Sequence, residues 1–180
     1  MQSLRTELGA EIRDKQGRLI QKIPFRACHS LLKQFIQVLA VNVSQASINI
    51  KSIDGTEYAT APSSANFRAN PAAGPTNYGI VIGTGNTAVT IDDYKLSAQL
   101  TASISYLASI IGVDKPDSST WRMSMTRGFL NNTGAQVEIK EVGWISFNAT
   151  KPSLLDRTLY NVTFESGETL TLTYRIVITL

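Results

Sequence analysis

The chain has 180 residues and a mass of 19.6 kDa, which fits one domain large enough to build a substantial core. Hydrophobic residues make up 43% of the chain and charged residues 17%, a balance that excludes intrinsically disordered, collagen-like and coiled-coil proteins. The formal charge is only +3 and the basic residues are scattered singly, so nucleic acid is not an expected partner.

The chain is poor in the side chains that catalysis and metal binding use. Its one cysteine, Cys28, cannot form an internal disulfide, and its one histidine, His29, excludes mechanisms that need two imidazoles. We therefore expect no catalytic residues, no metal and no cofactor, and we expect a protein that is not an enzyme. The start of the sequence lacks the pattern of a secretory signal, and no apolar run reaches the length of a membrane helix. A soluble protein made in a reducing cytoplasm, with no membrane partner, is the expectation.

Residues 1–24 predict a hairpin. Apolar and polar residues flank Asp14-Lys-Gln-Gly17, a turn sequence with glycine at the position that requires a positive φ. Pro24 then closes the hairpin. We expect residues 1–24 to form an arm that is separate from a single domain over residues 25–180.

Residues 25–43 predict the single helix of the chain. Apolar side chains recur there at three- to four-residue spacing, with polar residues between them. This spacing predicts a helix that packs its apolar face against the rest of the domain. The apolar residues are Cys28, Leu31, Leu32, Phe35, Ile36, Leu39 and Val43.

A second hairpin and a long loop follow the helix. Residues 47–60 alternate around Asp54-Gly55, the two-residue signal of a tight turn. Residues 61–77 hold three prolines and no hydrophobic period, so they predict a loop. A loop of this length inside one domain usually has a function.

From residue 78 onward the pattern is that of strands. Strands are expected within 78–82, 88–91, 92–96, 100–106, 121–130, 137–147, 160–164 and 169–180. The last strand is long and is expected to be central, with Leu170, Leu172, Tyr174, Ile176 and Ile178 on one face. The pattern predicts an all-β fold. We expect an antiparallel β-sandwich, jelly-roll or immunoglobulin-like, with one packed N-terminal helix and an N-terminal hairpin arm.

Several local patterns invite chemical interpretations that their spacing does not support. Gly83-Thr-Gly85 lacks the third glycine and the lysine of a phosphate-binding loop, so it predicts a turn. Asp54, Asp92 and Asp93 lack the spacing of a calcium loop. Three basic–aromatic neighbours are too dispersed to form a nucleic-acid surface, namely Phe67-Arg68, Trp121-Arg122 and Arg127 with Phe129.

Two further pairs fail on geometry. Cys28 and His29 are adjacent in the sequence, and neighbouring residues on a helix diverge by about 100°, so the thiol is badly placed for activation by the imidazole. Glu138 and Glu141 lie on opposite faces of a regular strand, so they do not form a pair of catalytic carboxylates.

The second half of the chain carries a string of turn-and-strand motifs. They are 79–96 (GIVIGTGNTAVTIDDYKL), 127–134 (RGFLNNTG), 137–143 (VEIKEVG), 154–157 (LLDR) and 167–176 (GETLTLTYRI). With these motifs, residues 78–180 resemble the small β-sandwich virion structural proteins of tailed bacteriophages, of head decoration, neck or tail accessory type. The arm and the helix match that family only in general character.

The resemblance implies a structural subunit without enzymatic activity, located in the virion after synthesis in the host bacterial cytoplasm. Its expected partners are itself, as a homo-oligomer, and other virion proteins of the capsid or tail. Residues 1–24 and 61–77 are the expected contact elements, because neither carries enough apolar surface to stay ordered by itself. The contact side chains we expect are Arg13, Arg18, Ile20, Ile23, Phe67, Arg68, Pro71 and Pro75.

The competing hypothesis is a carbohydrate- or receptor-binding module, because β-sandwiches often present loops to sugars. Its partner would be a glycan or a host receptor. Such a module requires an exposed aromatic platform, for which Tyr78, Trp121 and Trp144 are the candidates.

Overall fold

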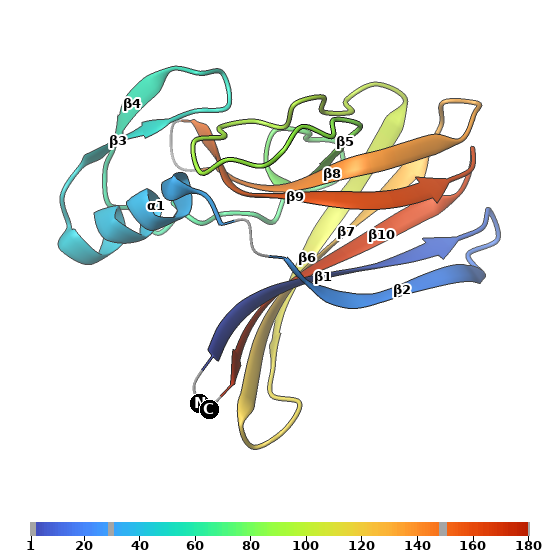
Figure 1. The fold of residues 1–180 in the computed structure, drawn as a ribbon, viewed down its shortest axis with the longest axis horizontal. Coiled ribbons are helices and arrows are strands. Elements are labelled where there is room, and N and C mark those ends of the chain that lie inside the picture. Colours follow the sequence, from blue (N-terminus) through green and yellow to red (C-terminus); the bar gives the residue numbers. More distant parts are fainter. Residues whose placement is uncertain (1–2, 29–30, 148–150, 180) are drawn as a thin grey trace.

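The computed structural model describes residues 3–28, 31–147 and 151–179, which form a predominantly β, antiparallel structure (Figure 1). The larger sheet has five strands, in the order β2 (Leu19–Cys28), β1 (Ser3–Arg13), β10 (Thr169–Thr179), β7 (Thr120–Asn131) and β6 (Ile104–Asp114). The smaller sheet has the order β5 (Gly79–Gly83), β8 (Val137–Phe147) and β9 (Pro152–Phe164). A two-stranded sheet, β3 (Ile48–Lys51) with β4 (Glu57–Thr60), and helix α1 (Lys33–Ser44) complete the elements described.

The smaller sheet covers only one end of the larger sheet, and the rest of the larger sheet extends past it (Figure 1). At the covered end, the face of the larger sheet that meets the second layer carries buried side chains such as Leu8, Leu172 and Phe129. We call this face the inner face. The uncovered end comprises residues 3–5, 110–114, 120–123 and 176–179.

The predicted N-terminal hairpin is present, but it is not a separate arm. Its turn forms around Asp14, whose C=O accepts the Gly17 N–H at 3.0 Å. β1 then pairs with β10 from Ser3 to Arg13, and its Leu8 and Ile12 side chains are buried in the core. The hairpin is therefore part of the larger sheet, because its apolar alternation continues the inner face of β10.

The predicted helix begins too early. Pro24 does not end the hairpin, since β2 continues to Cys28 and pairs there with Thr6 of β1. Proline is tolerated because β2 is an edge strand of the sheet. The helix starts at Lys33. Just before it, the chain lies against β9, where Leu32 N–H donates a hydrogen bond to Leu155 C=O.

The helix also buries only part of the face that was predicted. Its buried residues are Gln34, Val38 and Val41. Ile36, Leu39 and Val43, expected in the core, are 61%, 42% and 76% exposed. The apolar period is that of a helix, as predicted, and Phe35 packs against the core as expected, but the rest of the predicted apolar face within the helix is exposed.

Later strands confirm the pattern with three exceptions. The hairpin around Asp54, β5, β7, β8 and β10 form as expected, and β10 is the central strand of the larger sheet. β9 begins at Pro152, well before the predicted start at residue 160. Residues 88–96 form no strand and belong to a loop over residues 84–99. β6 begins at Ile104 and continues to Asp114, past the predicted end. Among the described residues, no helix has the length and apolar character needed to cross a membrane.

Candidate functional site

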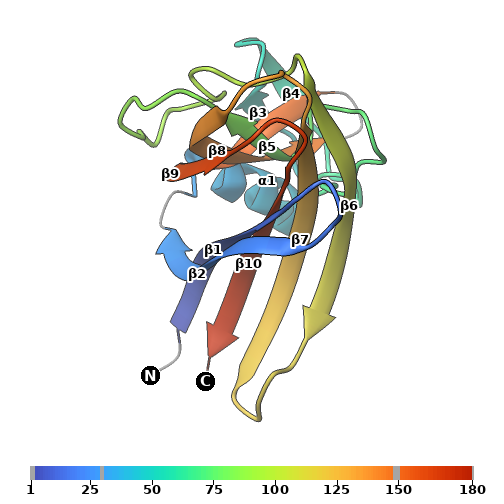
Figure 2. The same ribbon diagram turned by 90° about the vertical axis from the view of Figure 1, so that its right-hand side faces the viewer.

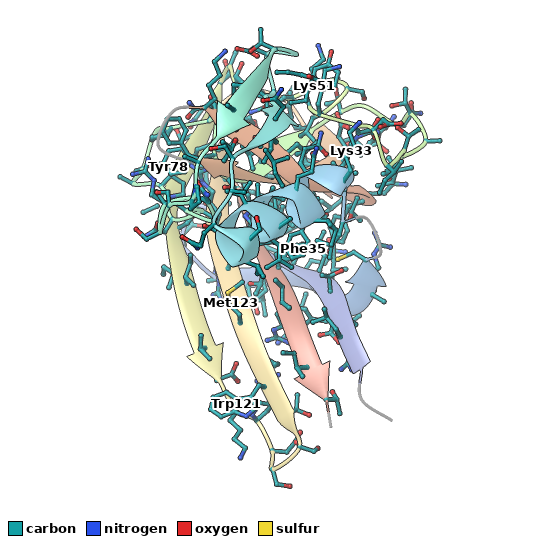
Figure 3. The ribbon with its side chains drawn as sticks, turned by 90° about the vertical axis from the view of Figure 1, so that its left-hand side faces the viewer. Lys33, Phe35, Lys51, Tyr78, Trp121 and Met123 are labelled. Atoms are coloured by element: carbon teal, nitrogen blue, oxygen red, sulfur yellow. The ribbon has the colours of Figure 1, made fainter. Side chains whose placement is uncertain are left out.

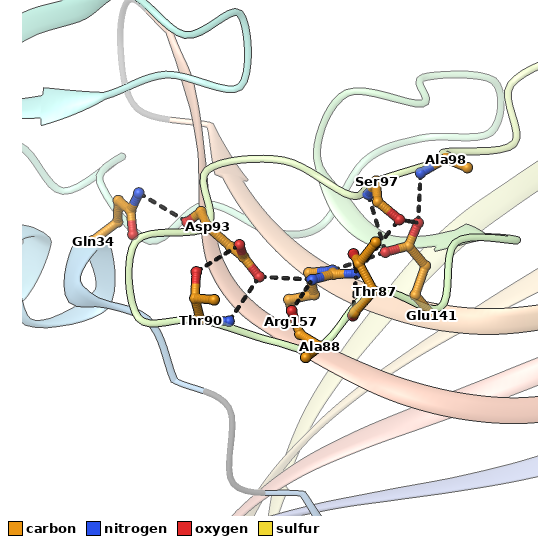
Figure 4. A network of polar contacts seen from close by, with 9 residues as sticks. All are labelled: Gln34, Thr87, Ala88, Thr90, Asp93, Ser97, Ala98, Glu141 and Arg157. Atoms are coloured by element: carbon orange, nitrogen blue, oxygen red, sulfur yellow. Dashed lines mark hydrogen bonds and ion pairs between the residues drawn. The ribbon is translucent and has the colours of Figure 1, made fainter.

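A buried ion network holds the 84–99 loop against the smaller sheet (Figure 4). Arg157, on β9, donates from Nε to Glu141 of β8 at 2.8 Å and from Nη1 to Asp93 of the loop at 2.7 Å. Its Nη2 donates to the Thr87 C=O at 3.0 Å and to the Thr87 hydroxyl at 2.8 Å. One arginine thus ties the loop to the sheet through two carboxylates and a loop carbonyl.

Both carboxylates of the network are ionised in spite of their environment. The side chains of Arg157 and Glu141 are 2% and 0% exposed. Burial raises the pKa of Glu141 and of Asp93, but hydrogen bonds from Arg157 and from backbone N–H groups outweigh burial and place both pKa values below their usual range. Because every charge has a partner, the network is a stable structural joint rather than a source of reactive groups.

Gly83 and Gly85 make room for this joint. The Glu141 carboxylate accepts the Ala98 N–H at 2.7 Å and the Ser97 N–H at 3.1 Å. A Cβ at Gly83 would lie 2.6 Å from Glu141 Oε1, and a Cβ at Gly85 would overlap the Ser97 hydroxyl. The Gly-Thr-Gly sequence is therefore a close-packing element at the end of β5, not the turn that was predicted, and Glu141 occupies the space that the glycines leave.

A second buried arginine, Arg127, has carbonyl partners. It donates to the C=O groups of Leu107, Tyr78 and Ile80 at 2.8–3.0 Å and also to that of Pro75. Burial lowers the pKa of Arg127 to about 10, so it remains charged at neutral pH. It is 0% exposed, so it takes no part in the protein surface. Its function in the fold is to fix the end of the 61–77 loop to β5 and β6.

A third buried group lies between the two sheets. Asp156 of β9 accepts hydrogen bonds from the Tyr174 hydroxyl and the Thr158 hydroxyl, each at 3.1 Å. Burial raises the pKa of Asp156 to about 6. Burial likewise raises the pKa of the nearby Cys28 thiol to about 11, so the cysteine is neutral and unreactive. The donors around Asp156 make a satisfied core carboxyl group, with no open space for a substrate in view.

The uncovered end presents a continuous apolar surface on the inner face of the larger sheet. The strand register places Leu4 beside Ile178 and Ile178 beside Trp121. These three side chains are 63%, 48% and 51% exposed. In the next row, Met123 lies beside both Ile176 and Val113, and Val113 is 67% exposed. In Figure 3, Trp121 lies toward the free end of the sheet and Met123 lies between it and α1.

We call this set of six side chains the apolar face: Leu4, Val113, Trp121, Met123, Ile176 and Ile178. It has the alternation of a strand that packs against a second layer. Met123 and Ile176 are half-buried at its border with the core, but the other four side chains are exposed and are not covered by the described parts of the chain. A surface of this kind on a protein marks an interaction site. It is the candidate functional site.

The residues expected to make assembly contacts lie in two environments. On the N-terminal hairpin, Arg18 and Ile20 are exposed, with Arg18 paired to Asp14 at 2.6 Å. Arg13 is half-buried and bonded to Glu11, and Ile23 packs partly against the core. None of these four belongs to the apolar face.

Of the four expected contact residues in the 61–77 loop, only Arg68 is exposed, and it lies over the rings of Tyr78 and Phe147. Phe67 packs against Phe35 and Trp144, with ring centroids 5.8 and 6.5 Å away. Pro71 is buried and Pro75 is half-buried. The loop is ordered by packing and by the Arg127 bonds, so Phe67 and Pro71 serve the core of this chain.

The three aromatic candidates for a sugar platform are dispersed. Trp144 is 3% exposed and stacks near Tyr174, while Tyr78 is half-buried against Phe147. Trp121 alone is exposed, at the far end of the other sheet. The three therefore do not share a surface.

The three aspartates considered for calcium have separate cationic partners. Asp54 pairs with Lys151, Asp92 with Lys33 and Asp93 with Arg157. Across residues 3–28, 31–147 and 151–179, no cluster of His, Cys, Asp or Glu side chains is placed to hold a metal ion. His29 lies outside the described residues, so the predicted geometry of the Cys28–His29 pair stays untested.

Sequence reasoning missed the role of Arg157, Glu141 and Asp93, although all three belong to the motifs quoted for the phage resemblance. A usable signal was present: Leu154-Leu-Asp-Arg157 places two charged residues inside an otherwise buried strand. Charged residues in such a run require buried partners. The apolar face, in contrast, could not be recognised from the local sequence, because its residues continue the same alternation of apolar and polar residues as the core strands.

Comparison with known proteins identified no relative: no protein-family model matches the chain, and no curated protein or solved structure matches it.

Proposed function

We propose that the chain is a non-enzymatic structural subunit of a bacteriophage particle, a capsid decoration or a head–tail or tail accessory protein, that acts through contacts with neighbouring subunits. The observation that carries the proposal is the apolar face, an uncovered layer-forming surface on a folded sheet. The motifs of residues 78–180, which resemble those of phage virion proteins, support the choice of particle.

The finer fold proposal is a β-sandwich whose second layer is incomplete. The two facing sheets support it, with strands β8 and β9 over β1, β10 and β7. In an assembled particle, a neighbouring subunit would complete the missing part of that layer by packing on the apolar face. Such a role requires rigid shape rather than chemistry, and the buried arginine joints supply that rigidity.

The test is whether the chain is present in particles. Particles from a lysate of the source phage are purified by density gradient, and the chain is sought by mass spectrometry and by immunogold electron microscopy with an antibody to the purified protein. We expect it at a regular position in many copies per particle. Its presence in the lysate but absence from the particles would overturn the proposal.

Tagged variants test whether the apolar face makes the contact with the particle. Trp121→Ser removes the largest side chain of the apolar face, and Gln21→Ser changes an exposed residue on the opposite edge strand. Supplied during infection, the tagged Gln21→Ser protein should enter particles as well as the tagged wild type does. The Trp121→Ser protein should stay in the soluble fraction, folded as judged by circular dichroism.

A further inference from the structure

The two edge strands of the larger sheet differ in how they are protected. β2 carries Lys22, Pro24 and Arg26, and its pairing with β1 has two register shifts. Lysine, proline and bulges are the devices by which proteins prevent an edge strand from pairing with another chain. The β2 edge is therefore closed to association.

β6, the opposite edge, is protected over only part of its length. The 61–77 loop covers its first part, where Ser109 N–H donates to Pro71 C=O and Gly74 N–H donates to Tyr106 C=O, each at 2.9 Å. Residues 110–114 make no such bond within the described parts of the chain. Figure 2 shows this stretch at the outer side of the sheet.

The open stretch is also unusually apolar. From Ile104 to Val113, β6 contains no charged residue, and Asp114 is paired with Arg122. Ile110 and Val113 are 70% and 67% exposed. An exposed, uncharged edge without proline is a template for strand addition.

The backbone of this stretch is directed outward in a definite pattern. Ser109 donates its N–H away from β7, and in an antiparallel strand alternate residues direct N–H and C=O to the same side. Ile111 and Val113 therefore direct their backbone groups at the open edge. Gly112 lies between them, and its backbone N–H and C=O are directed toward β7. A strand added at the open edge would therefore meet Gly112 at a non-hydrogen-bonded position.

Gly112 is not explained by its own chain. A Cβ built there has no heavy atom within 4 Å, and its backbone has no positive φ. Glycine inside a strand weakens the strand, and it marks places where another backbone approaches closely. In a non-hydrogen-bonded antiparallel pair the two Cα atoms are about 4.5 Å apart, which is the closest approach within a sheet.

We propose that a second copy of this chain pairs with residues 110–114 of β6, antiparallel, with a two-fold axis at Gly112, and so joins two five-stranded sheets into one. Ile111 of one protomer then faces the partner's Val113, and Gly112 faces the partner's Gly112. A second copy fits because the same uncharged apolar strand is present on both sides, so no like charges oppose each other. This inference rests on the proposed function and names one of its contacts.

The pairing leaves the apolar faces of both protomers on the same side of the joined sheet. An antiparallel strand pair is related by an axis perpendicular to the sheet, so the dimer presents Met123 and Trp121 twice on one surface. The interface between the two copies is short, five residues from each, because the 61–77 loop and the turn at 115–119 limit it.

Disulfide trapping tests the register. Gly112→Cys places two thiols opposite each other at a spacing that a disulfide spans, while native Cys28 is buried and unreactive. Gln21→Cys, on the closed β2 edge, is the matched control. Under mild oxidation Gly112→Cys should form a covalent dimer roughly tenfold faster than Gln21→Cys does, because paired strands hold the thiols together.

Sedimentation of the reduced protein supplies the second measurement. Val113→Lys adds a charge to the open edge and should convert the dimer to monomer, whereas Gln21→Lys should leave the dimer intact. Both variants should keep the wild-type circular dichroism spectrum. A Val113→Lys protein that remains dimeric would overturn the proposal.

The outcomes separate this inference from the proposed function. If Gly112→Cys does not cross-link either in solution or in purified particles that contain the chain, the β6 pairing is wrong and the structural function stands. If it cross-links but the chain is absent from particles, the pairing stands and the virion function is wrong.

Discussion

The two ends of the larger sheet have the same sequence pattern and opposite environments. On β10, Leu170, Leu172 and Tyr174 are 0–2% exposed, while Ile178, on the same face of the same strand, is 48% exposed. The alternation is uninterrupted between them. Strand periodicity therefore defines a face that is built to be covered, but it does not say whether the cover comes from the same chain.

The covered end also holds the buried charges. Arg127, Arg157, Glu141 and Asp156 are each 0–1% exposed and all lie at this end. Asp156 lies between the two sheets, and Arg157 and Glu141 lie between the smaller sheet and the 84–99 loop. At the uncovered end the ion pair of Arg122 with Asp114 is at the surface. We infer that the buried ion pairs make the covered end rigid, and that the uncovered end is completed by contacts with a neighbouring subunit. Three comparisons between the ends test this.

The largest expected effect is from breaking the ion network at the covered end. Arg157→Met removes the cation from Glu141 and Asp93 and leaves Glu141 fully buried without a counter-charge. Loss of one partner of a buried pair costs about 3–5 kcal/mol in the free energy of unfolding. Urea denaturation followed by circular dichroism measures the change.

Arg122→Met is the matched substitution at the uncovered end. Its ion pair with Asp114 is partly solvated, so the same measurement should show a much smaller change. Equal losses in the two variants would contradict the assignment of rigidity to the covered end.

The sequence predicts much of the covered end, because periodicity and turn signals act locally. The hairpin at Asp14, the turn at Gly134 and the central position of β10 follow from such signals. The 84–99 loop was misread as strands because residues such as Val89 and Ile91 are β-branched. The conformation of this segment is instead fixed by its bonds to Glu141 and Arg157, which are remote from it in the sequence.

The orientation of α1 could not be predicted for a related reason. Its strongest apolar stripe, Ile36, Leu39 and Val43, is exposed, and the weaker face with Gln34 is buried because the Gln34 amide donates to the Asp93 C=O at 3.1 Å. The choice between the faces depends on the loop, which no helical period encodes. The apolar face of the sheet was missed likewise, since a side chain that awaits a partner has the same pattern as one in the core.

Two alanine substitutions on one face of β10 compare the ends directly. Leu172→Ala creates a cavity at a fully buried position and should lower the free energy of unfolding by about 2–5 kcal/mol. Ile178→Ala removes a half-exposed side chain and should cost less than about 1 kcal/mol in the dilute protein. Chemical denaturation of both variants at low protein concentration, where association is weakest, gives the ratio of the two losses in unfolding free energy.

A large cost for Ile178→Ala at low concentration would mean that the uncovered end is already packed within one chain. The two tryptophans provide an independent check, because Trp144 is buried at the covered end and Trp121 is exposed at the other. Acrylamide should quench Trp121 far more than Trp144, and assembly should protect Trp121 alone.

The last comparison concerns the buried carboxyl at the covered end, and its effect on stability depends on pH. Because burial raises the pKa of Asp156 from its ordinary value to about 6, the folded state holds the carboxyl proton more tightly than the unfolded state does. The stabilisation is complete below about pH 4 and is lost as pH rises through about 6, a loss of up to about 3 kcal/mol. Asp93 and Glu141, whose pKa values are lowered, lose stability in the opposite direction, as pH falls.

Asp156→Asn isolates the carboxyl from these opposing contributions. The amide oxygen still accepts from the Tyr174 hydroxyl but does not ionise, so the difference in unfolding free energy between variant and wild type should favour the variant increasingly from pH 4 to pH 7 and level off above. Denaturation of both proteins across that range, followed by circular dichroism, measures this difference. A difference that stays flat with pH would mean that water reaches Asp156 between the sheets, and the covered end would then be no drier than the end that awaits its neighbour.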